Sequence, residues 1–566
     1  MKKLGIGIFL LLTLVSCKKE IRHGQPEEAS LVNFSFFDSR ISIDSVKINS
    51  LKDTKIKDFY IQYQYKTVWD NSSYRDFMLN EISKAEDEGL EPEDYLYSTL
   101  KNYEEKFSDL EDSIKIKYDL LLTENTLRYI NHISKGKLNP YKIYNNYDVP
   151  EKKVEDIKIL YDCIDNNNFS SAIENCKPNH IIYQKLKKAL KTLRTMPQES
   201  FTGVVDLTEK FKKNKKNKNI PLIKKKLMYW GDMEQKDSIL TTVLDENTQE
   251  ALKKFQKRHG LFPDGVPGRS TLDALNYTRN MRIEQVIANL ERWRWYKNSF
   301  GNHYLLINIP DYKIVAIKDE DTIQTQRIVV GKDTRKTPIL ESKVSNINLN
   351  PNWTVPPTIL NEDIFPEAIK NRSEFQKRGL VILDRKKQEV SPWRWKLEDA
   401  KKYSYVQKPG RNNSLGSMKI NFPNKFSVYL HDTNHRDYFV YTYRSLSSGC
   451  VRLEKPMEMA EHILNDTIWS LQKIIDTTDI KYYRKLQEKK KQEYNKKIAK
   501  LKAKNPEIEI PEKKWTDPEL KTIVVNVKDE IFIHQLYWTA WEDDGVLKFR
   551  EDIYCYDHEI YSKLRY

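Results

Sequence analysis

The amino-acid sequence predicts a multidomain α+β protein, helical in its first half and β-rich in its second. Two patterns carry this prediction. Apolar residues recur at helical spacing through residues 51–205 and again through residues 206–280. From residue 304 onward, runs rich in β-branched side chains and separated by turn residues replace that pattern. The chain has 566 residues, which is enough for three or four domains that each bury a core.

The N-terminus has the features of a secretory signal. Two lysines precede an apolar run, residues 4–15, that is too short to span a bilayer stably. The run ends at Cys17, with Leu14 three positions before it, and this resembles the lipobox of bacterial lipoproteins. The resemblance implies a lipoprotein signal peptide over residues 1–17, acylation of Cys17, and a periplasmic protein that is lipid-anchored to a membrane, with the outer membrane favoured. The alternative is an ordinary signal peptide in which Cys17 is incidental.

The composition indicates folded domains that work beside an acidic surface. A hydrophobic fraction of 39% and 33 tyrosines are typical of ordered domains. The net charge of +15 favours anionic neighbours. Because an exported chain rarely meets nucleic acid, we expect the cell wall and membrane headgroups to be those neighbours, with no nucleic-acid partner.

Residues 51–205 predict a helical scaffold domain, which follows a polar tether over residues 18–50. Glu91-Pro92 is typical of a helix start with proline in the first turn. Residues 114–134 repeat the helical pattern until Gly136 breaks it. This region contains no catalytic constellation of its own.

Residues 206–280 predict a compact helical unit after a Lys/Asn-rich link that we interpret as a solvated segment. The helical run that contains Phe255 and Gln256 leads into His259-Gly260-Leu261, turn residues follow at 263–268, and a further helix is expected at 270–276. This order resembles the small three-helix peptidoglycan-binding domain of cell-wall enzymes, with His259 expected to be structural. A helical linker without a ligand is the alternative.

Residues 281–475 predict the β-rich domain. After a helix signal, strands are expected at 304–309, 313–317 and 326–331. The proline-rich segment 350–357 is typical of an edge or a loop. Residues from about 360 to 405 are polar and partly helical, and we expect this insertion to form a lid beside the site.

Cys450 is the strongest candidate for chemistry. It follows Gly449 and lies nineteen residues after His431, which ends a strand-like run. A thiol becomes a strong nucleophile when a base or a positive field lowers its pKa. Gly449 would let a substrate carbonyl approach the backbone, whose N–H groups could receive a developing oxyanion. The pair therefore predicts acyl transfer through a thioester.

The motifs resemble those of the large periplasmic L,D-transpeptidases of Gram-negative bacteria. The similar segments extend over most of the chain and are 292–295, 337–338, 350–357, 408–416, 429–433, 444–452, 536–541 and 549–554. The resemblance implies a helical scaffold domain, a three-helix peptidoglycan-binding-like domain and a β-rich L,D-transpeptidase catalytic domain with a lid insertion.

The resemblance also implies a reaction on peptidoglycan stem peptides and glycan. Cys450 would take the acyl group of a tetrapeptide at its third residue, D-alanine would leave, and a neighbouring stem amine would accept the acyl group to give a 3–3 cross-link. His431 matches the family's base. The positions that match oxyanion or substrate contacts are Tyr429, Ser448, Gly449, Arg444 and Arg452. One of the two arginines is expected to bind a substrate carboxylate bidentately, while a loop-fixing salt bridge is the alternative for Arg452.

Other functions stay open from sequence alone. The same thioester could pass to water, to a free D-amino acid or to a protein amine. A non-catalytic peptidoglycan-binding lipoprotein would predict a degraded Cys/His motif. A metal site at His431 and His435 is disfavoured, because the pair follows a strand and contains turn formers, so we expect no metal or cofactor.

The remaining cysteines and the C-terminal region complete the prediction. Cys163 and Cys176 either form a disulfide or remain thiols, with thiols favoured. Cys555 lies in an apolar-aromatic run and is expected to be a packing residue. Residues 476–520 predict a solvated Lys-rich helical extension, with 11 Lys or Arg among the 24 residues 481–504. Residues 521–566 predict strands that pack on the catalytic domain, with a hairpin turn at 542–545.

Overall fold

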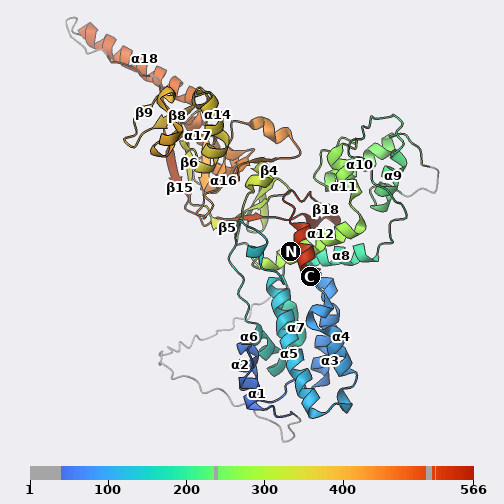
Figure 1. Ribbon diagram of the computed structural model, residues 1–566. Coiled ribbons are helices and arrows are strands. Elements are labelled where there is room, and N and C mark those ends of the chain that lie inside the picture. The colour runs from blue at the N-terminus through green and yellow to red at the C-terminus, as the bar shows by residue number, and fades with distance from the viewer. Residues whose placement is uncertain (1–39, 235–239, 505–512, 517, 566) are drawn as a thin grey trace, which may run out of the picture.

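The computed structural model describes residues 40–234, 240–504, 513–516 and 518–565. A helical region, a small helical unit and a β-rich body with one projecting helix meet at a central junction (Figure 1). The predicted multidomain α+β class is therefore confirmed. The signal sequence, Cys17 and the first part of the tether lie outside the described residues.

The helical region is built around the long helix α5, Asp112–Lys135, whose buried apolar residues include Tyr118, Leu122, Ile130 and Ile133. Asp119 on this helix accepts hydrogen bonds from the Tyr60 hydroxyl at 2.5 Å and from two backbone N–H groups, those of Val68 and Trp69. These bonds tie the N-terminal segments to α5. The other helices of the region are α1 Ser45–Asn49, α2 Thr54–Gln62, α3 Ser72–Ser83, α4 Tyr97–Glu104, α6 Asp156–Asp165, α7 Phe169–Cys176 and α8 Ile181–Thr195.

The small helical unit contains α9 Ile220–Tyr229, α10 Glu246–Arg258 and α11 Arg269–Asn276 around a separate apolar core. Its turn chemistry explains the sequence motif. The Gln256 side chain donates to the Val266 carbonyl at 3.0 Å and accepts from the Gly265 N–H at 2.9 Å. Gly265 has φ +73°, and a Cβ there would lie 2.9 Å from the Gln249 carbonyl oxygen, so only glycine fits.

A twelve-stranded curled sheet forms the β-rich body, in the order β1-β5-β16-β2-β3-β4-β14-β12-β11-β6-β15, with β13 on β4. The strands are β1 Tyr147–Asp148, β2 His303–Asn308, β3 Lys313–Lys318, β4 Asp321–Gly331, β5 Ile339–Lys343, β6 Asn346–Leu349, β11 Met418–Asn421, β12 Leu430–His431, β13 Ser445–Ser447, β14 Val451–Leu453, β15 Ile523–Asn526 and β16 Phe532–Leu536.

The C-terminal region contributes two strands to this sheet, whereas the sequence predicts strands that pack on the domain. Strand β16 lies between β5 and β2, and β15 extends the far edge beside β6. The hairpin β17 Ala540–Asp543 and β18 Val546–Phe549 turns at the predicted place. The last helix, α19 Asp557–Arg565, was not expected from the sequence, and it packs against α12, Arg279–Trp295.

The insertion has more internal structure than the polar, partly helical segment that the sequence predicts, and its role as a lid stays a prediction. It is a small subdomain with its own four-stranded sheet and an apolar core that includes Phe365, Phe375, Trp395 and Tyr405. Its strands are β7 Trp353–Thr354, β8 Leu380–Leu383, β9 Glu389–Val390 and β10 Ser404–Gln407, with β7 at the edge; its helices include α13 Pro357–Ile359, α14 Phe365–Lys370 and α15 Glu374–Lys377. These four buried aromatic rings, together with aliphatic residues such as Ile364 and Ile382, form a core in a segment whose composition is mostly polar.

Helix α16, Pro456–Leu464, and helix α17, Leu471–Thr478, cover the end of the β-rich body and lead into α18, Ile480–Lys504. Helix α18 projects away from the body and buries none of its residues, as expected for a solvated charged helix (Figure 1). Among the described helices, none has the length and apolar character needed to cross a bilayer.

The cysteines outside the site follow the prediction at two positions and contradict it at one. Cys163 and Cys176 are free and buried in the helical region. Cys555 is exposed, so its predicted packing role is wrong. It has φ +59° in the turn before α19, which directs its side chain outward while Tyr554 and Tyr556 on either side are buried.

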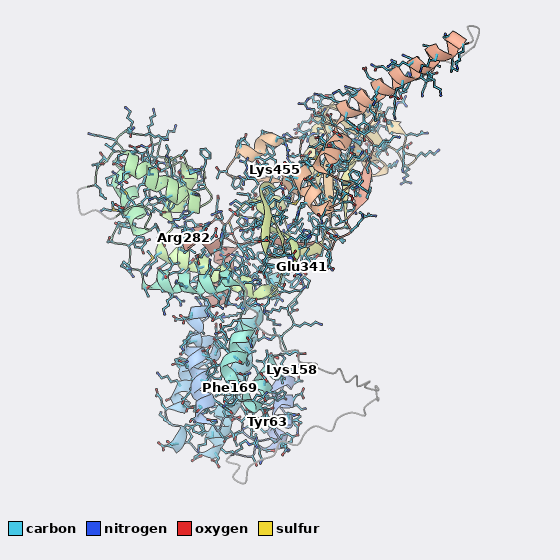
Figure 2. All side chains as sticks on the ribbon, turned by 180° about the vertical axis from the view of Figure 1, so that it is seen from behind. Tyr63, Lys158, Phe169, Arg282, Glu341 and Lys455 are labelled. Atoms are coloured by element: carbon cyan, nitrogen blue, oxygen red, sulfur yellow. The ribbon has the colours of Figure 1, made fainter. Side chains whose placement is uncertain are left out.

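Helix α12 is the junction of the molecule. All its residues from Gln285 to Trp295 are buried, and it contacts α8 of the helical region as well as α19. Figure 2 places Tyr63 and Phe169 in the helical region and Arg282, near the start of α12, where the small helical unit meets the body. A helix buried on all sides in this way is fixed by ion pairs as well as by apolar packing, because its polar side chains cannot reach water.

Candidate active site

Strand register places the candidate residues on one face of the sheet. Lys419 of β11 pairs with His431 of β12, which pairs with Arg452 of β14. The Val451 N–H donates to the Tyr429 carbonyl at 3.1 Å, which continues the ladder back to Cys450. Because side chains alternate between faces, Tyr429, His431, Lys419, Cys450 and Arg452 share one face.

The opposite face of the same strands anchors them. Ile420, Leu430 and Val451 alternate with the site residues and are fully buried in the core. The alternation therefore explains how three short strands hold polar chemistry on one side and a close-packed interior on the other.

The turn before Cys450 is held by local hydrogen bonds. Gly449 has φ +113°, a conformation that favours glycine. The Ser447 hydroxyl accepts from the Gly449 N–H at 3.1 Å and donates to the Cys450 carbonyl at 2.6 Å. The Thr337 hydroxyl donates to the Gly449 carbonyl at 2.9 Å, and the Tyr554 hydroxyl accepts from the Thr337 N–H at 3.0 Å. Because the Gly449 N–H is engaged, the Cys450 N–H and the Tyr429 hydroxyl are the better candidates for an oxyanion.

The thiol and the imidazole are both neutral in the resting site. Burial raises the pKa of the Cys450 thiol, while the Tyr429 backbone, Lys419, the Tyr429 hydroxyl and Arg452 act in the opposite direction. Burial and then Arg452 lower the pKa of His431 to about 3. The buried Nδ1 of His431 has no hydrogen-bond partner in the part of the chain that the structure describes. The site therefore holds an uncharged imidazole that can accept a proton and a thiol that still carries one.

Lys419 is a site residue that the sequence motifs do not identify. Its ammonium lies 3.8 Å from the centre of the Tyr429 ring. Burial lowers the pKa of Lys419, and the neighbouring Cys450 acts against that shift. The sequence gives one indication of this position, the alternation Met418-Lys419-Ile420. Met418 and Ile420 are buried in the core, so Lys419 between them points to the other face of the strand, where the site lies. Only the pairing with His431 shows that this strand belongs to the site.

The two candidate arginines have different surroundings. Arg444 is buried and donates to the backbone carbonyls of Ile328, Tyr441 and Tyr312 at 2.7–3.1 Å, so it fixes the loop that precedes the site. Arg452 donates to the Thr433 hydroxyl at 3.2 Å, and no carboxylate in the described chain forms an ion pair with it. Arg452 is therefore the better placed of the two for a substrate carboxylate.

The insertion reaches the cysteine turn through one arginine. Arg335 donates to the Ser448 hydroxyl at 3.0 Å and forms ion pairs with Asp363 at 2.6 Å and with Glu362. Both acids belong to a single π-helical turn, Leu360–Ile364, at the start of the insertion. Ser448 itself is exposed, so the insertion is attached beside the open side of the site.

His435 is not placed like a metal ligand. Its exposed ring stacks on Tyr438 with ring centres 5.0 Å apart, at the start of a loop turn. In the described parts of the chain, no three His, Cys, Asp or Glu side chains gather as a metal-binding group.

A thiol beside a histidine, with two cations and backbone donors close by, defines a candidate nucleophilic enzyme site on a curled sheet. Comparison with known families identifies the domains. Residues 302–475 match the family described as "L,D-transpeptidase catalytic domain", residues 216–275 match "Putative peptidoglycan binding domain", and residues 54–190 match "Scaffold domain". The chain thus carries an L,D-transpeptidase catalytic domain joined to peptidoglycan-binding and scaffold domains, which confirms the resemblance found in the sequence.

Individual relatives are more distant. A Haemophilus influenzae protein named "Putative L,D-transpeptidase" is 31% identical over 258 residues, which are 45% of this chain and 45% of that protein. The chain thus matches less than half the length of this relative. Crystal structures of L,D-transpeptidases from Stackebrandtia nassauensis and Xylanimonas cellulosilytica are 14% and 15% identical, with TM-scores of 0.19 and 0.16. They cover 46% and 47% of this chain and 91% and 94% of their own.

Replacing Lys419 with methionine is expected to slow alkylation of Cys450 at pH 7 about three- to ten-fold, because loss of the cation disfavours the thiolate. Burial already raises the Cys450 pKa, so alkylation should accelerate as the pH rises, and the variant should shift this profile to higher pH. Iodoacetamide labelling followed by peptide mass spectrometry measures the rate at Cys450. Lys419→Arg keeps the charge and should stay near wild type, as should the exposed-site control Lys386→Met. If the alkylation rate of Cys450 depends on pH in the same way in Lys419→Met and in wild type, Lys419 does not influence the ionisation of the thiol.

Proposed function

We propose that this chain is an L,D-transpeptidase that forms 3–3 cross-links between peptidoglycan stem peptides through a thioester on Cys450, with release of D-alanine. The observation that carries the proposal is the placement of Cys450, His431 and Tyr429 on one sheet face of a domain that matches L,D-transpeptidases. The peptidoglycan-binding match of the small helical unit supports the same substrate.

In this proposal the Cys450 sulfur attacks the carbonyl carbon of the third residue, and its proton passes to the His431 imidazole. The Cys450 N–H and the Tyr429 hydroxyl stabilise the oxyanion. As the tetrahedral intermediate collapses, the C–N bond breaks and D-alanine leaves with that proton. An amine of a second stem then attacks the thioester, the new amide forms, and the thiol is regenerated with the amine's proton.

A negatively charged group of the substrate would make His431 a stronger base than it is in the free protein. Burial and then Arg452 lower the pKa of His431 to about 3, so the imidazole is a weak base before substrate binds. A substrate carboxylate bound by Arg452 would offset the charge of that arginine, which is the second cause of the low pKa after burial. Substrate binding would then raise the basicity of His431 when the thiol needs a proton acceptor.

Mass spectrometry of products from purified disaccharide-tetrapeptide tests the proposal. A dimer that lacks one D-alanine supports the cross-linking transpeptidase. Loss of D-alanine without a dimer would instead assign the same thioester to hydrolysis, and added D-amino acids or a protein amine would report exchange or attachment. No reaction by folded protein that still binds peptidoglycan would contradict the enzyme and favour a wall-binding lipoprotein.

We further propose that the protein works outside the cytoplasm, in the periplasm, with Cys17 lipid-anchored to the outer membrane. Support comes from the lipobox-like N-terminus and from the peptidoglycan substrate of the proposed reaction. Metabolic labelling with an alkyne fatty acid should mark wild type, and Cys17→Ala should lose the label and appear in the soluble periplasmic fraction. Labelling that survives in Cys17→Ala would contradict the anchor.

A further inference from the structure

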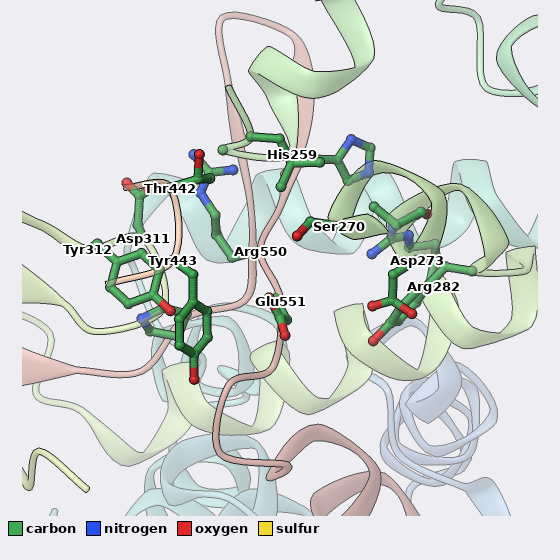
Figure 3. Close-up of a pocket in the computed structure, with 15 residues that line it drawn as sticks. His259, Ser270, Asp273, Arg282, Asp311, Tyr312, Thr442, Tyr443, Arg550 and Glu551 are labelled. Atoms are coloured by element: carbon green, nitrogen blue, oxygen red, sulfur yellow. Dashed lines mark hydrogen bonds and ion pairs between the residues drawn. The ribbon is translucent and has the colours of Figure 1, made fainter. Parts of the chain in front are cut away.

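A cavity lies between the small helical unit and the β-rich domain, apart from the Cys450 turn. His259, Asp273 and Arg282 line one side, Tyr312 lies opposite, and Arg550 and Glu551 lie between them (Figure 3). Its volume of about 60 Å³ has room for a carboxylate-sized group with water. The lining residues come from four separate parts of the sequence, 259–282, 310–312, 442–443 and 550–551, so the cavity exists only in the folded chain.

Arg282 brings to this cavity a buried cation that forms no ion pair within the described residues. It is 3% exposed, and its guanidinium lies between the rings of Tyr277 and Phe549 at 4.2 and 4.3 Å. It donates to the Gln285 side chain at 2.7 Å and to the Ala274 carbonyl at 3.0 Å. Burial lowers its pKa to about 9, while Tyr277 and, more weakly, Asp273 act in the opposite direction. A buried guanidinium bonded only to neutral acceptors favours an anion on its open side.

The other buried arginine of the cavity is already balanced. Arg550 donates to the Asp311 carboxylate at 2.5 Å and to the Arg258 carbonyl at 3.0 Å. Among the described residues that line the cavity, Arg282 is thus the buried cation left without an acid.

Two buried polar atoms beside the cavity also lack partners. The His259 Nδ1 lies 2.8 Å from the Phe255 carbonyl, so this nitrogen carries the proton and Nε2 is the acceptor. Neither His259 Nε2 nor the Tyr312 hydroxyl has a hydrogen-bond partner among the described residues, and His259 is 5% exposed. They offer a ligand one acceptor on the side of Arg282 and one donor on the opposite side of the cavity.

The mouth of the cavity has the opposite charge. Asp273 and Glu551 are both exposed, and neither belongs to an ion pair within the described chain. Although the residue reaches solvent, partial burial of its carboxyl group, followed by the charges of Asp273 and Asp552, raises the pKa of Glu551. An ammonium group placed near these carboxylates would relieve their mutual repulsion.

We propose that this cavity binds an α-amino-acid zwitterion, with the carboxylate on Arg282 and the ammonium toward Asp273 and Glu551. A free amino acid and the unblocked amino-acid end of a stem-peptide side chain share this chemistry. The peptide-borne source rests on the proposed function, whereas the free amino acid does not.

The position of the cavity links it to the catalytic domain. The Tyr312 carbonyl accepts from Arg444 at 3.1 Å, and Thr442, which lies two residues before Arg444, lines the cavity. A stem peptide held here would lie on the small helical unit and against the segment that leads to Cys450. The site would therefore retain cell-wall peptide beside the domain that modifies it.

Calorimetric titration of the full chain in detergent, as the Cys450→Ala variant to prevent turnover, tests the site. The probes are D-alanine, D-alaninamide, N-acetyl-D-alanine and a disaccharide-tetrapeptide whose third residue has an unblocked amino-acid end. If the cavity binds a free amino acid, D-alanine should bind saturably. If the zwitterion must be part of a stem peptide, only the tetrapeptide should bind saturably. If D-alanine binds, D-alaninamide and N-acetyl-D-alanine should each bind at least ten-fold more weakly than D-alanine. If only the tetrapeptide binds, acetylation of the amino group at its unblocked amino-acid end should weaken its binding by the same factor.

Variants assign the binding to this cavity. Asp273→Asn combined with Glu551→Gln should weaken zwitterion binding at least ten-fold, and this pair is exposed, so folding should persist. Arg282→Met should abolish binding if it folds, and Glu320→Gln, an exposed turn acid elsewhere, should change nothing. The proposal is overturned if neither D-alanine nor the tetrapeptide binds saturably, or if the acetylated probes bind as tightly as the free ones. It is also overturned if the Asp273→Asn, Glu551→Gln variant binds as tightly as the Cys450→Ala protein from which it is made. Absence of cross-linking by Cys450-containing protein would overturn the proposed function while leaving this binding result intact.

Discussion

Replacing Cys450 with alanine is expected to abolish D-alanine release and dimer formation, with a loss of about 10³-fold or more, while the fold is retained. The sulfur is the atom that would carry the acyl group, and no neighbouring side chain can replace it on the same sheet face. The thiol is only partly buried and its turn is held by Ser447 and Thr337, so removing it leaves that framework in place. Product mass spectrometry and circular dichroism measure the two outcomes.

The chain supplies a matched control for this experiment. Cys555 is also free, but it is exposed and remote in sequence from the motif, so Cys555→Ala should keep the wild-type rate. Iodoacetamide should label both cysteines in wild type and only the remaining one in each variant. A folded Cys450→Ala protein with an unaltered rate would sink the thioester mechanism.

Replacing Glu291 with alanine is expected to destabilise the junction by about 3–5 kcal/mol, because it leaves a buried charge uncompensated. Glu291 and Arg294 are both fully buried and form an ion pair at 2.5 Å. Glu291 also accepts from the Leu138 N–H at 2.7 Å and from the Trp295 ring N–H at 3.2 Å, so it joins α12 to the helical region. A fall of roughly 6–15 °C in the first thermal transition should follow.

An exposed ion pair provides the comparison. Glu559→Gln breaks a partly exposed pair with Lys563 on α19, and it should change stability by less than about 0.5 kcal/mol. The double variant Glu291→Leu with Arg294→Leu should recover part of the loss, since both buried charges disappear together. Differential scanning calorimetry separates the transitions of a multidomain chain. Equal shifts for Glu291→Ala and Glu559→Gln would contradict a structural role for the buried pair.

The centre of the candidate site could be predicted because its residues lie close together in sequence. Cys450 and His431 are linked by a short stretch of chain, and the residue types alone indicate the chemistry. Lys419 could not be predicted, since its place beside Tyr429 depends on how β11 pairs with β12. The roles of Arg444 and Arg452 were equally inaccessible, because both are arginines in one motif and only burial and hydrogen-bond partners separate them.

The sequence by itself determined the order of helical and β-rich regions, the turn chemistry around Gly265 and the nucleophile motif. Each of these depends on local preference or on neighbours a few residues away. Only the tertiary structure decided that β16 enters the middle of the sheet, that α19 packs on α12, and that Arg282 meets Asp273 and Glu551 around one cavity. These contacts join segments far apart in the chain, and they are selected by long-range strand pairing and by burial of charged groups, which local patterns do not encode.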